Sequence, residues 1–153
     1  MTEAVVNLRF ERKPSPVLAE HRPLYKIGQI LLILHLASRG RRSKLPRMHL
    51  FNWALKSAER REQLVNASKS KHLQVSAWGF DPALAIAVRY AIAEGLVRET
   101  PTGYEITEDG ESFARSIVAD PGLFSAEKIF FGAVGKGITE TMVETVANGW
   151  EAS

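Results

Sequence analysis

The longest apolar run in the chain extends from Leu24 to Ser38 and reads LYKIGQILLILHLAS. Its apolar side chains recur at helical spacing and also fill most of the remaining circumference, so the pattern predicts a helix that is buried on nearly every side. A helix of this length would extend roughly 22 Å, which is too short to cross a bilayer. Gly28, Gln29 and His35 also interrupt the run. We therefore expect it to form the central helix of a soluble core.

A basic turn and two further helices are expected after this run. The turn is Arg39-Gly40-Arg41-Arg42, in which Gly40 is a natural helix stop. Ser43 is then expected to cap a second helix, whose first turn tolerates Pro46 because the backbone donors there have no helical partner. The pattern next predicts a third helix from Ala58 to Ser68 and a loop that holds a short strand at about Leu73 to Val75.

The following segment predicts a helix, a hairpin and another helix. Asp81-Pro82 is a typical helix start, and this helix should run to Glu94 and end at Gly95. Two strand-like runs joined by Pro101-Thr102-Gly103 predict a β-hairpin. Thr107 is expected to cap the next helix, and the helix dipole favours the acidic residues of its first turns. This order of elements predicts a mainly α fold with a small β-hairpin, a winged helix-turn-helix with a C-terminal helical extension.

Three regions are expected along the chain. Residues 1–23 contain three prolines and are interpreted as an N-terminal arm, in which Val6, Leu8 and Phe10 alternate as in a strand; an unstructured terminus is the alternative. Residues 24–120 are expected to form the winged-helix domain. Residues 121–153 are expected to form the C-terminal helical extension, with helices at about 125–134 and 139–148.

The composition argues against an enzyme. The chain of 153 residues has no cysteine, which excludes disulfides, thiolate metal sites and a Cys nucleophile and agrees with a cytoplasmic location. The four histidines lack ligand spacing, and GAVGKGIT at 132–139 lacks the spacing of a phosphate-binding loop. No apolar run is long enough to span a membrane. We therefore expect no catalytic residue, no metal, no cofactor and no membrane partner.

Charge is distributed unevenly. Residues 39–72 carry ten Lys or Arg and two Asp or Glu, whereas residues 99–153 carry three and ten. The basic segment predicts contact with a DNA backbone, without sequence preference. A solvated surface or an interface for an acidic protein remain alternatives. The candidate DNA-backbone contacts are Arg39, Arg41, Arg42, Lys44, Arg47, Arg60, Arg61, Lys69 and Lys71, and Lys56 lies in the same segment.

The helix that precedes the hairpin lacks the residues that read DNA bases. In a winged helix this element normally enters the major groove. Here it reads PALAIAVRYAIAE, and its polar side chains are Arg89, Tyr90 and Glu94. Direct base readout depends on Arg, Lys, Asn or Gln at the base edges, which Ala, Ile and Val cannot replace. The hairpin tip is acidic as well. The sequence therefore predicts a winged helix without the usual reading surface.

The C-terminal third is acidic but rich in large apolar residues. These residues either complete the core or form a patch for a partner subunit. Phe130 and Phe131 would point about 100° apart on a helix, so we expect one to face the body and the other to face outward. Trp150 is expected to lie beyond the last helix. The candidate partner-interface residues are Phe130, Phe131, Met142 and Trp150.

Several stretches of the chain resemble a known family. The run RPLYKIGQILLILHLASRGRRSKLPRMHLFNWALKS, with FDPALAIAVRYAIAEGLV and GYEITEDGESFA after it, is similar to the small middle component of bacterial ABC-three-component systems, as in Lamassu-type defence complexes. The resemblance covers about residues 22–120, and RPLYKIGQ and HLFNWALKS carry most of it. It implies a small winged-helix protein that accompanies a large SMC-like ATPase and an effector subunit in defence against phage or plasmids.

Two functions are therefore expected. The first is a non-enzymatic accessory subunit that docks on an SMC-like or ABC-type ATPase and contacts double-stranded DNA through its backbone, independently of sequence. The alternative is a winged-helix DNA-binding transcriptional regulator. Sequence-selective retention of one duplex would distinguish the second from the first.

Overall fold

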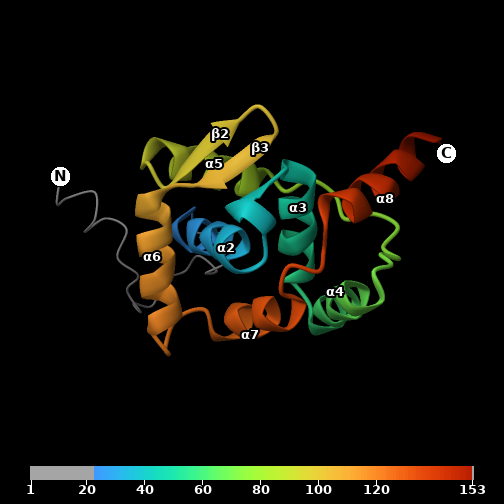
Figure 1. Ribbon diagram of the computed structural model, residues 1–153, viewed down its shortest axis with the longest axis horizontal. Coiled ribbons are helices and arrows are strands. Elements are labelled where there is room, and N and C mark those ends of the chain that lie inside the picture. Colours follow the sequence, from blue (N-terminus) through green and yellow to red (C-terminus); the bar gives the residue numbers. More distant parts are fainter. Residues whose placement is uncertain (1–22, 153) are drawn as a thin grey trace.

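The computed structural model describes residues 23–152, with side chains up to residue 149, so the expected arm at 1–22 lies outside the described residues. The described chain is mainly helical with a small antiparallel sheet, as the sequence predicts (Figure 1). None of its helices is long and apolar enough to cross a membrane. The elements in order are α2 (Pro23–Leu36), the 3-10 helix η2 (Arg39–Arg41), β1 (Arg42–Ser43), α3 (Leu45–Ala54), α4 (Ala58–Ser70), α5 (Pro82–Ala93), β2 (Val97–Thr100), β3 (Gly103–Ile106), α6 (Glu108–Ala119), α7 (Ser125–Val134) and α8 (Glu140–Ala152).

Helix α2 is the centre of the molecule, as its apolar pattern predicts. Every residue from Lys26 to Leu34 is buried, and α2 packs against α5, α6 and α7 (Figure 1). Each buried Leu or Ile contributes about 1.5–3 kcal/mol to the free energy of unfolding. The two polar residues of this stretch, Lys26 and Gln29, are buried as well and make hydrogen bonds to other elements. The central helix therefore supplies both the core and its buried polar contacts.

The sheet has three strands rather than the two of the predicted hairpin. Its order is β1-β3-β2, and all pairs are antiparallel. Ser43 pairs with Tyr104 in the sheet and does not cap α3, whose N-cap position is taken by Lys44. Two residues are too few to show strand alternation, so the sequence alone could not predict β1. A Cβ atom on Gly103 would lie 2.6 Å from the Ser43 carbonyl oxygen, so the close approach of β1 requires glycine there.

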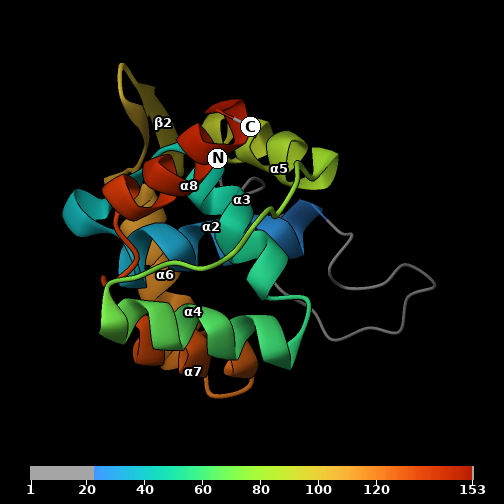
Figure 2. The ribbon, with the colours of Figure 1, turned by 90° about the vertical axis from the view of Figure 1, so that its right-hand side faces the viewer.

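The segment from 71 to 81 is irregular, and the strand expected at about Leu73 to Val75 does not form. Leu73, Val75 and Trp78 are buried against the core, which explains the strand-like apolar pattern. No other strand among residues 23–152 pairs with this segment, so its period of two reflects packing alone. Figure 2 shows the segment crossing from the end of α4 to the start of α5.

Helix α7 belongs to the core, which agrees with the first of the two alternatives for the C-terminal third. It packs against α2 and α4 (Figure 2). Phe130 and Phe131 are 4% and 0% exposed, and both rings meet Phe51 edge-on, with centroids at 6.2 and 5.7 Å. Two neighbouring rings can both be buried because α7 is covered from two directions. The large apolar residue of α7 that faces outward is Ile129, which is 75% exposed.

Helix α8 extends further than the sequence predicts. It includes Trp150, which was expected beyond the last helix; the side chain of that residue lies outside the described part. Val143 is buried, and Met142 and Val146 pack partly buried against the core. The structure therefore gives Phe130 and Phe131 no surface for a partner, and it leaves Met142 only partly accessible.

Candidate functional site

The structure divides the basic segment into buried, anchored and free side chains. Arg47, expected to contact DNA, is 3% exposed. Its guanidinium donates to the carbonyl oxygens of Ala37 and Ile138 and, at 2.8 Å, to Ser38 Oγ, and it lies over the Phe51 ring. Burial lowers the pKa of Arg47 to about 10, which leaves it charged at neutral pH. Arg47 therefore ties α3 to the end of α2 and to the start of α8, and it does not reach DNA.

Two other basic residues anchor the end of α3. Arg60 donates to the Trp53 carbonyl at 3.2 Å and lies 4.7 Å from the centre of the indole ring. Arg61 donates to the Leu55 carbonyl at 2.9 Å. The last carbonyls of a helix lack helical partners, so the two side chains help to satisfy this end, where the Lys56 N–H also donates to the Trp53 carbonyl at 3.3 Å. Both residues are partly buried. Their positive charge remains, but their main contacts are within the protein.

Arg41 of the basic turn and Lys44 just after it form ion pairs with acidic residues distant in sequence. Arg41 Nη1 lies 2.8 Å from Glu111 Oε2, and Lys44 Nζ lies 3.6 Å from Glu144 Oε1. The Lys44 backbone N–H also donates to Glu140 Oε2 at 2.9 Å. The acidic C-terminal third therefore neutralises part of the basic turn, an interaction that the separate charge counts of the two segments could not indicate.

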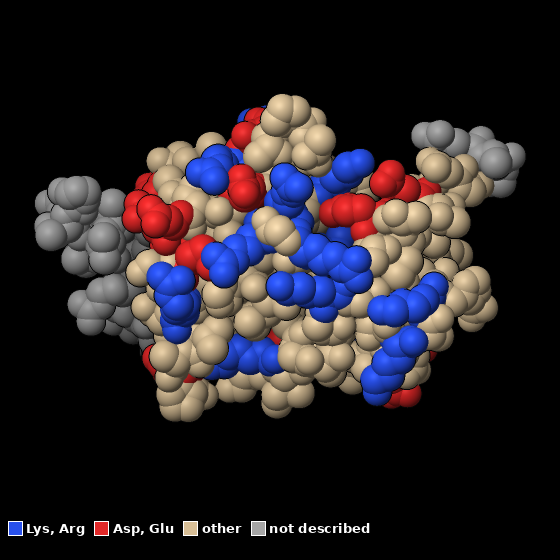
Figure 3. Space-filling model, viewed as in Figure 1, with Lys and Arg blue, Asp and Glu red and all other residues tan. Residues whose placement is uncertain are grey.

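A basic face remains after these contacts. Among the described residues, Arg39, Arg42, Lys69 and Lys71 are exposed and have no ion pair with another described residue. Figure 3 shows Lys and Arg side chains gathered on the side that carries η2 and the end of α4. We call Arg39, Arg41, Arg42, Lys44, Lys69 and Lys71 the basic face. Cations that are free of internal partners are the ones available to phosphate oxygens.

Helix α5 presents apolar side chains on both its faces. Leu84, Ala87, Val88 and Ala91 point into the core, as the helical period predicts. On the opposite side, Ile86 and Tyr90 are 51% and 52% exposed, and Phe80 just before the helix is 65% exposed. We call Phe80, Ile86 and Tyr90 the apolar row. Single exposed apolar residues are common, but Ile86 and Tyr90 lie one turn apart on the outer face of α5 and mark a surface that water solvates poorly.

An aromatic groove adjoins this row. Its apolar half, of about 330 Å³, is lined by Leu45, Pro46, His49, Trp78, Gly79 and Phe80. Its polar half, of about 290 Å³, shares His49 and residues 78–80 and adds Asn52, Trp53, Lys56, Asp81 and Pro82. The Trp78 indole donates to the Pro46 carbonyl at 3.0 Å, which holds the 71–81 segment against α3. No local period in the sequence predicts this groove, although the aromatic cluster in AWGFDP is a signal for it.

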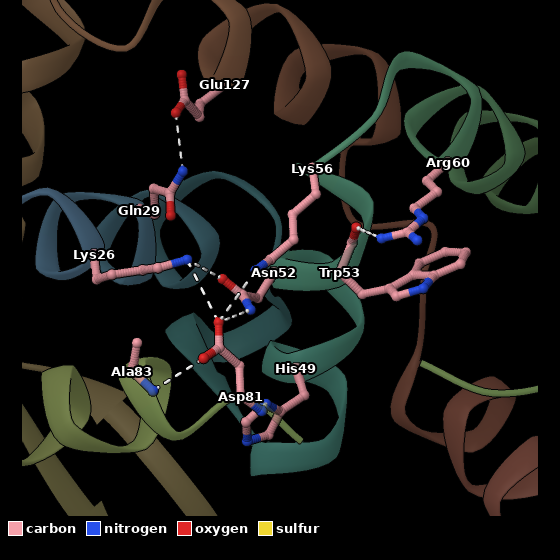
Figure 4. Close-up of polar contacts among 10 residues, drawn as sticks. All are labelled: Lys26, Gln29, His49, Asn52, Trp53, Lys56, Arg60, Asp81, Ala83 and Glu127. Carbon is pink, nitrogen blue, oxygen red and sulfur yellow. Dashed lines mark hydrogen bonds and ion pairs between the residues drawn. The ribbon is translucent and has the colours of Figure 1, made fainter. Parts of the chain in front are cut away.

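A polar network lies behind the groove (Figure 4). Lys26 Nζ donates to Asn52 Oδ1 at 2.6 Å, and Asn52 Nδ2 donates to Asp81 Oδ2 at 2.9 Å. Asp81 also accepts from the Ala83 N–H at 2.9 Å, which confirms it as the N-cap of α5. Burial opposes ionisation of Asp81, but hydrogen bonds from Asn52 and Ala83 and the charges of Lys56 and Lys26 lower its pKa below the usual value. The network therefore holds an ionised carboxylate beside a buried ammonium group.

His49 lies between the network and the groove. Its Nδ1 accepts a hydrogen bond from the Asp81 N–H at 3.2 Å, and its ring is tilted against Phe80 at 4.7 Å. Burial lowers the pKa of His49, and the charge of Asp81 opposes this shift only in part, so the ring is neutral at neutral pH. Because Nδ1 is the acceptor, the single proton is on Nε2. Nε2 is buried and has no partner in the described residues.

No group of three or more His, Asp or Glu in residues 23–152 is arranged to hold a metal ion. The comparisons add no relative: the chain matches no family model, and neither a curated protein nor a solved structure is detectably similar to it.

Proposed function

We propose that this protein is a non-enzymatic winged-helix subunit of a bacterial defence complex, in which it docks on an SMC-like or ABC-type ATPase that works with an effector subunit in the cytoplasm. The strand order β1-β3-β2 and the position of α5 immediately before the β2–β3 hairpin support a winged helix. In this reading α4 and the 71–81 segment form an insertion before the helix that corresponds to the DNA-reading helix. The resemblance of residues 22–120 to middle components supports the choice of host complex.

The observation that carries this proposal is the apolar row on and beside α5. A DNA-reading helix presents donors and acceptors to base edges. Here the same position carries Phe80, Ile86 and Tyr90 at 65%, 51% and 52% exposure. Aromatic and aliphatic side chains of this size are typical of the centre of protein interfaces. The helix that would meet DNA in a regulator is therefore better suited to a protein partner.

Co-purification tests the docking function. The chain and the SMC-like ATPase expected to be encoded beside it are expressed together, and the complex is isolated through a tag on the ATPase. Replacing a central aromatic anchor costs about 2 kcal/mol or more, which corresponds to a roughly 30-fold loss of affinity. The double variant Ile86→Ser, Tyr90→Ser should therefore lose the ATPase. Ile129→Ser on α7 is the control, since it removes an exposed apolar side chain, at 75% exposure, elsewhere on the surface.

Retention of the ATPase by the double variant would contradict docking through α5. Circular dichroism must first establish that both variants are folded. Because Ile86 and Tyr90 are half exposed, their replacement should change stability little. Loss of the complex with an intact fold therefore reports on the interface.

The second function that we propose for the protein is contact with a DNA backbone through the basic face. The four exposed cations Arg39, Arg42, Lys69 and Lys71 support it, because none is paired with another described residue. Binding through phosphates alone should be weak, independent of sequence and steeply reduced by salt. The double variant Arg39→Glu, Arg42→Glu should weaken duplex binding and reduce the salt slope, whereas Arg115→Glu on α6 should not. Tight retention of one particular sequence would instead favour the transcriptional regulator.

A further inference from the structure

The aromatic groove is built more like a receptor for one side chain than like a cofactor site. Each half, at about 330 and 290 Å³, is near the lower end of the range for small-molecule pockets. The apolar half is walled by Trp78, Phe80 and Pro46, and the polar half adjoins it and shares His49 and residues 78–80 with it. The apolar half has room for one large apolar side chain of a bound segment. The backbone of that segment and its neighbouring residue would then lie over the polar half.

His49 is a buried hydrogen-bond donor that lacks an acceptor. The residue is only 5% exposed and lines both halves of the groove. Its Nδ1 is occupied by the Asp81 N–H, and no described residue accepts from its Nε2. Leaving a buried donor unsatisfied is costly, and most such groups in proteins are paired. An occupant that brings an oxygen acceptor would relieve this cost.

The polar half of the groove favours a negative occupant. Both oxygens of the Asp81 carboxylate are already engaged, Oδ1 by the Ala83 N–H and Oδ2 by Asn52 and Lys56. The Lys56 side chain is 38% exposed at this end, so its ammonium group is the charge that an entering group meets. Figure 4 shows His49, on α3, and Lys56, just after the end of α3, both beside Asp81.

The groove lies at the start of α5, the helix that carries Ile86 and Tyr90, because Phe80, Asp81 and Pro82 line it. We propose that the aromatic groove binds one large apolar side chain of a partner protein, whose adjacent acidic residue meets Lys56 while an oxygen of the same segment accepts the hydrogen bond of His49 Nε2. This inference rests on the docking function proposed above and names the chemistry of the partner segment. The Phe80 ring lies 4.7 Å from the imidazole and is 65% exposed, and the proposal requires a side-chain movement that makes the buried Nε2 accessible to the occupant.

The experiment uses the isolated chain and blocked dipeptides, so it does not depend on the ATPase. The probes are acetyl-Phe-Glu-amide, acetyl-Phe-Lys-amide and adenosine monophosphate, each titrated while ¹H–¹⁵N spectra are recorded. We expect the Glu peptide to shift the Trp78 indole N–H and the His49 Nε2 signal. We expect it to bind up to about 5-fold more tightly than the Lys peptide, which is the range of one exposed ion pair.

Two variants and one control complete the test. Lys56→Glu should reverse the preference between the two peptides, and Phe80→Ala should abolish the shift, whereas Ile129→Ala should bind as the parent chain does. No shift of Trp78 or His49 up to the solubility limit of the Glu peptide would overturn the inference. Tighter binding of adenosine monophosphate than of either peptide would also overturn it, in favour of a nucleotide site. If the peptide binds but the ATPase does not co-purify, the proposed docking partner is wrong and the groove is still a peptide site. If the ATPase co-purifies but the peptide does not bind, docking uses another surface.

Discussion

Replacing Phe131 by Ala should show that the C-terminal third of the chain is core and not a detachable docking arm. Phe131 is fully buried on α7, and its ring meets Phe51 edge-on with centroids 5.7 Å apart. A buried Phe→Ala replacement costs about 3–5 kcal/mol, because the transfer free energy is lost and a cavity remains. A domain of this size has a free energy of unfolding of about 5–15 kcal/mol, so one residue removes a large part of it. Ile129→Ala, on the same helix but 75% exposed, should change it by less than about 0.5 kcal/mol.

Urea unfolding followed by circular dichroism measures both variants, and deletion of residues 123–153 extends the test. The deletion removes six buried side chains, each contributing about 1.5–3 kcal/mol, so the total is on the order of 10 kcal/mol. They are Phe124, Phe130, Phe131, Val134, Ile138 and Val143. The truncated chain should therefore be insoluble or unfolded. A truncated chain with a cooperative unfolding transition, or equal midpoints for the Phe131 and Ile129 variants, would refute this reasoning.

Three further variants follow from close contacts and charges. Asp81→Asn keeps a side chain that can cap α5 but removes the carboxylate that lies 3.7 Å from the buried Lys26 ammonium group, which should cost about 3 kcal/mol in urea unfolding. Because the native pKa of Asp81 is lowered, its ionised carboxylate stabilises the folded state at pH values above the pKa of an unfolded Asp, about 4. This stabilisation is lost as the pH falls through the native pKa. The free energy of unfolding of the Asn variant should lack this dependence on acid pH. Gly110→Ala would place a Cβ atom 2.1 Å from the Leu96 carbonyl oxygen and should lower the thermal midpoint, at a cost of about 1–3 kcal/mol. Gly132 lies on α7, where an added Cβ atom would meet nothing within 4 Å. Gly132→Ala should therefore raise the free energy of unfolding by about 0.5–1 kcal/mol, and a lower thermal midpoint would contradict the helix assignment.

The regular elements could be predicted because their signals are local. The apolar run at 24–38, the Asp81-Pro82 start of α5 and the cap at Thr107 each depend on residues within one or two turns. The hairpin was likewise predictable from Pro101-Thr102-Gly103. The structure bears out these elements with boundary shifts of a few residues. Mainly helical composition with a small hairpin was therefore within reach of the sequence.

The candidate sites depended on contacts between distant residues, which the sequence could not provide. Arg47 and Arg39 look equivalent in a charge count, yet the Ile138 carbonyl, from the other end of the chain, helps to bury the first, and the second stays exposed. The pair Arg41–Glu111 similarly joins segments 70 residues apart. The number of free cations on the basic face is thus a property of the tertiary structure.

The amino-acid sequence by itself determined which helices form and that α2 is buried, because backbone hydrogen bonds and apolar periodicity act over a few residues. Only the tertiary structure decided that Phe130 and Phe131 are both buried, since this requires two different elements, α2 and α4, to cover α7 from two sides. It also decided that His49, Trp78 and Phe80 meet in one groove. Their meeting depends on how an irregular segment crosses α3, and no local period encodes that path.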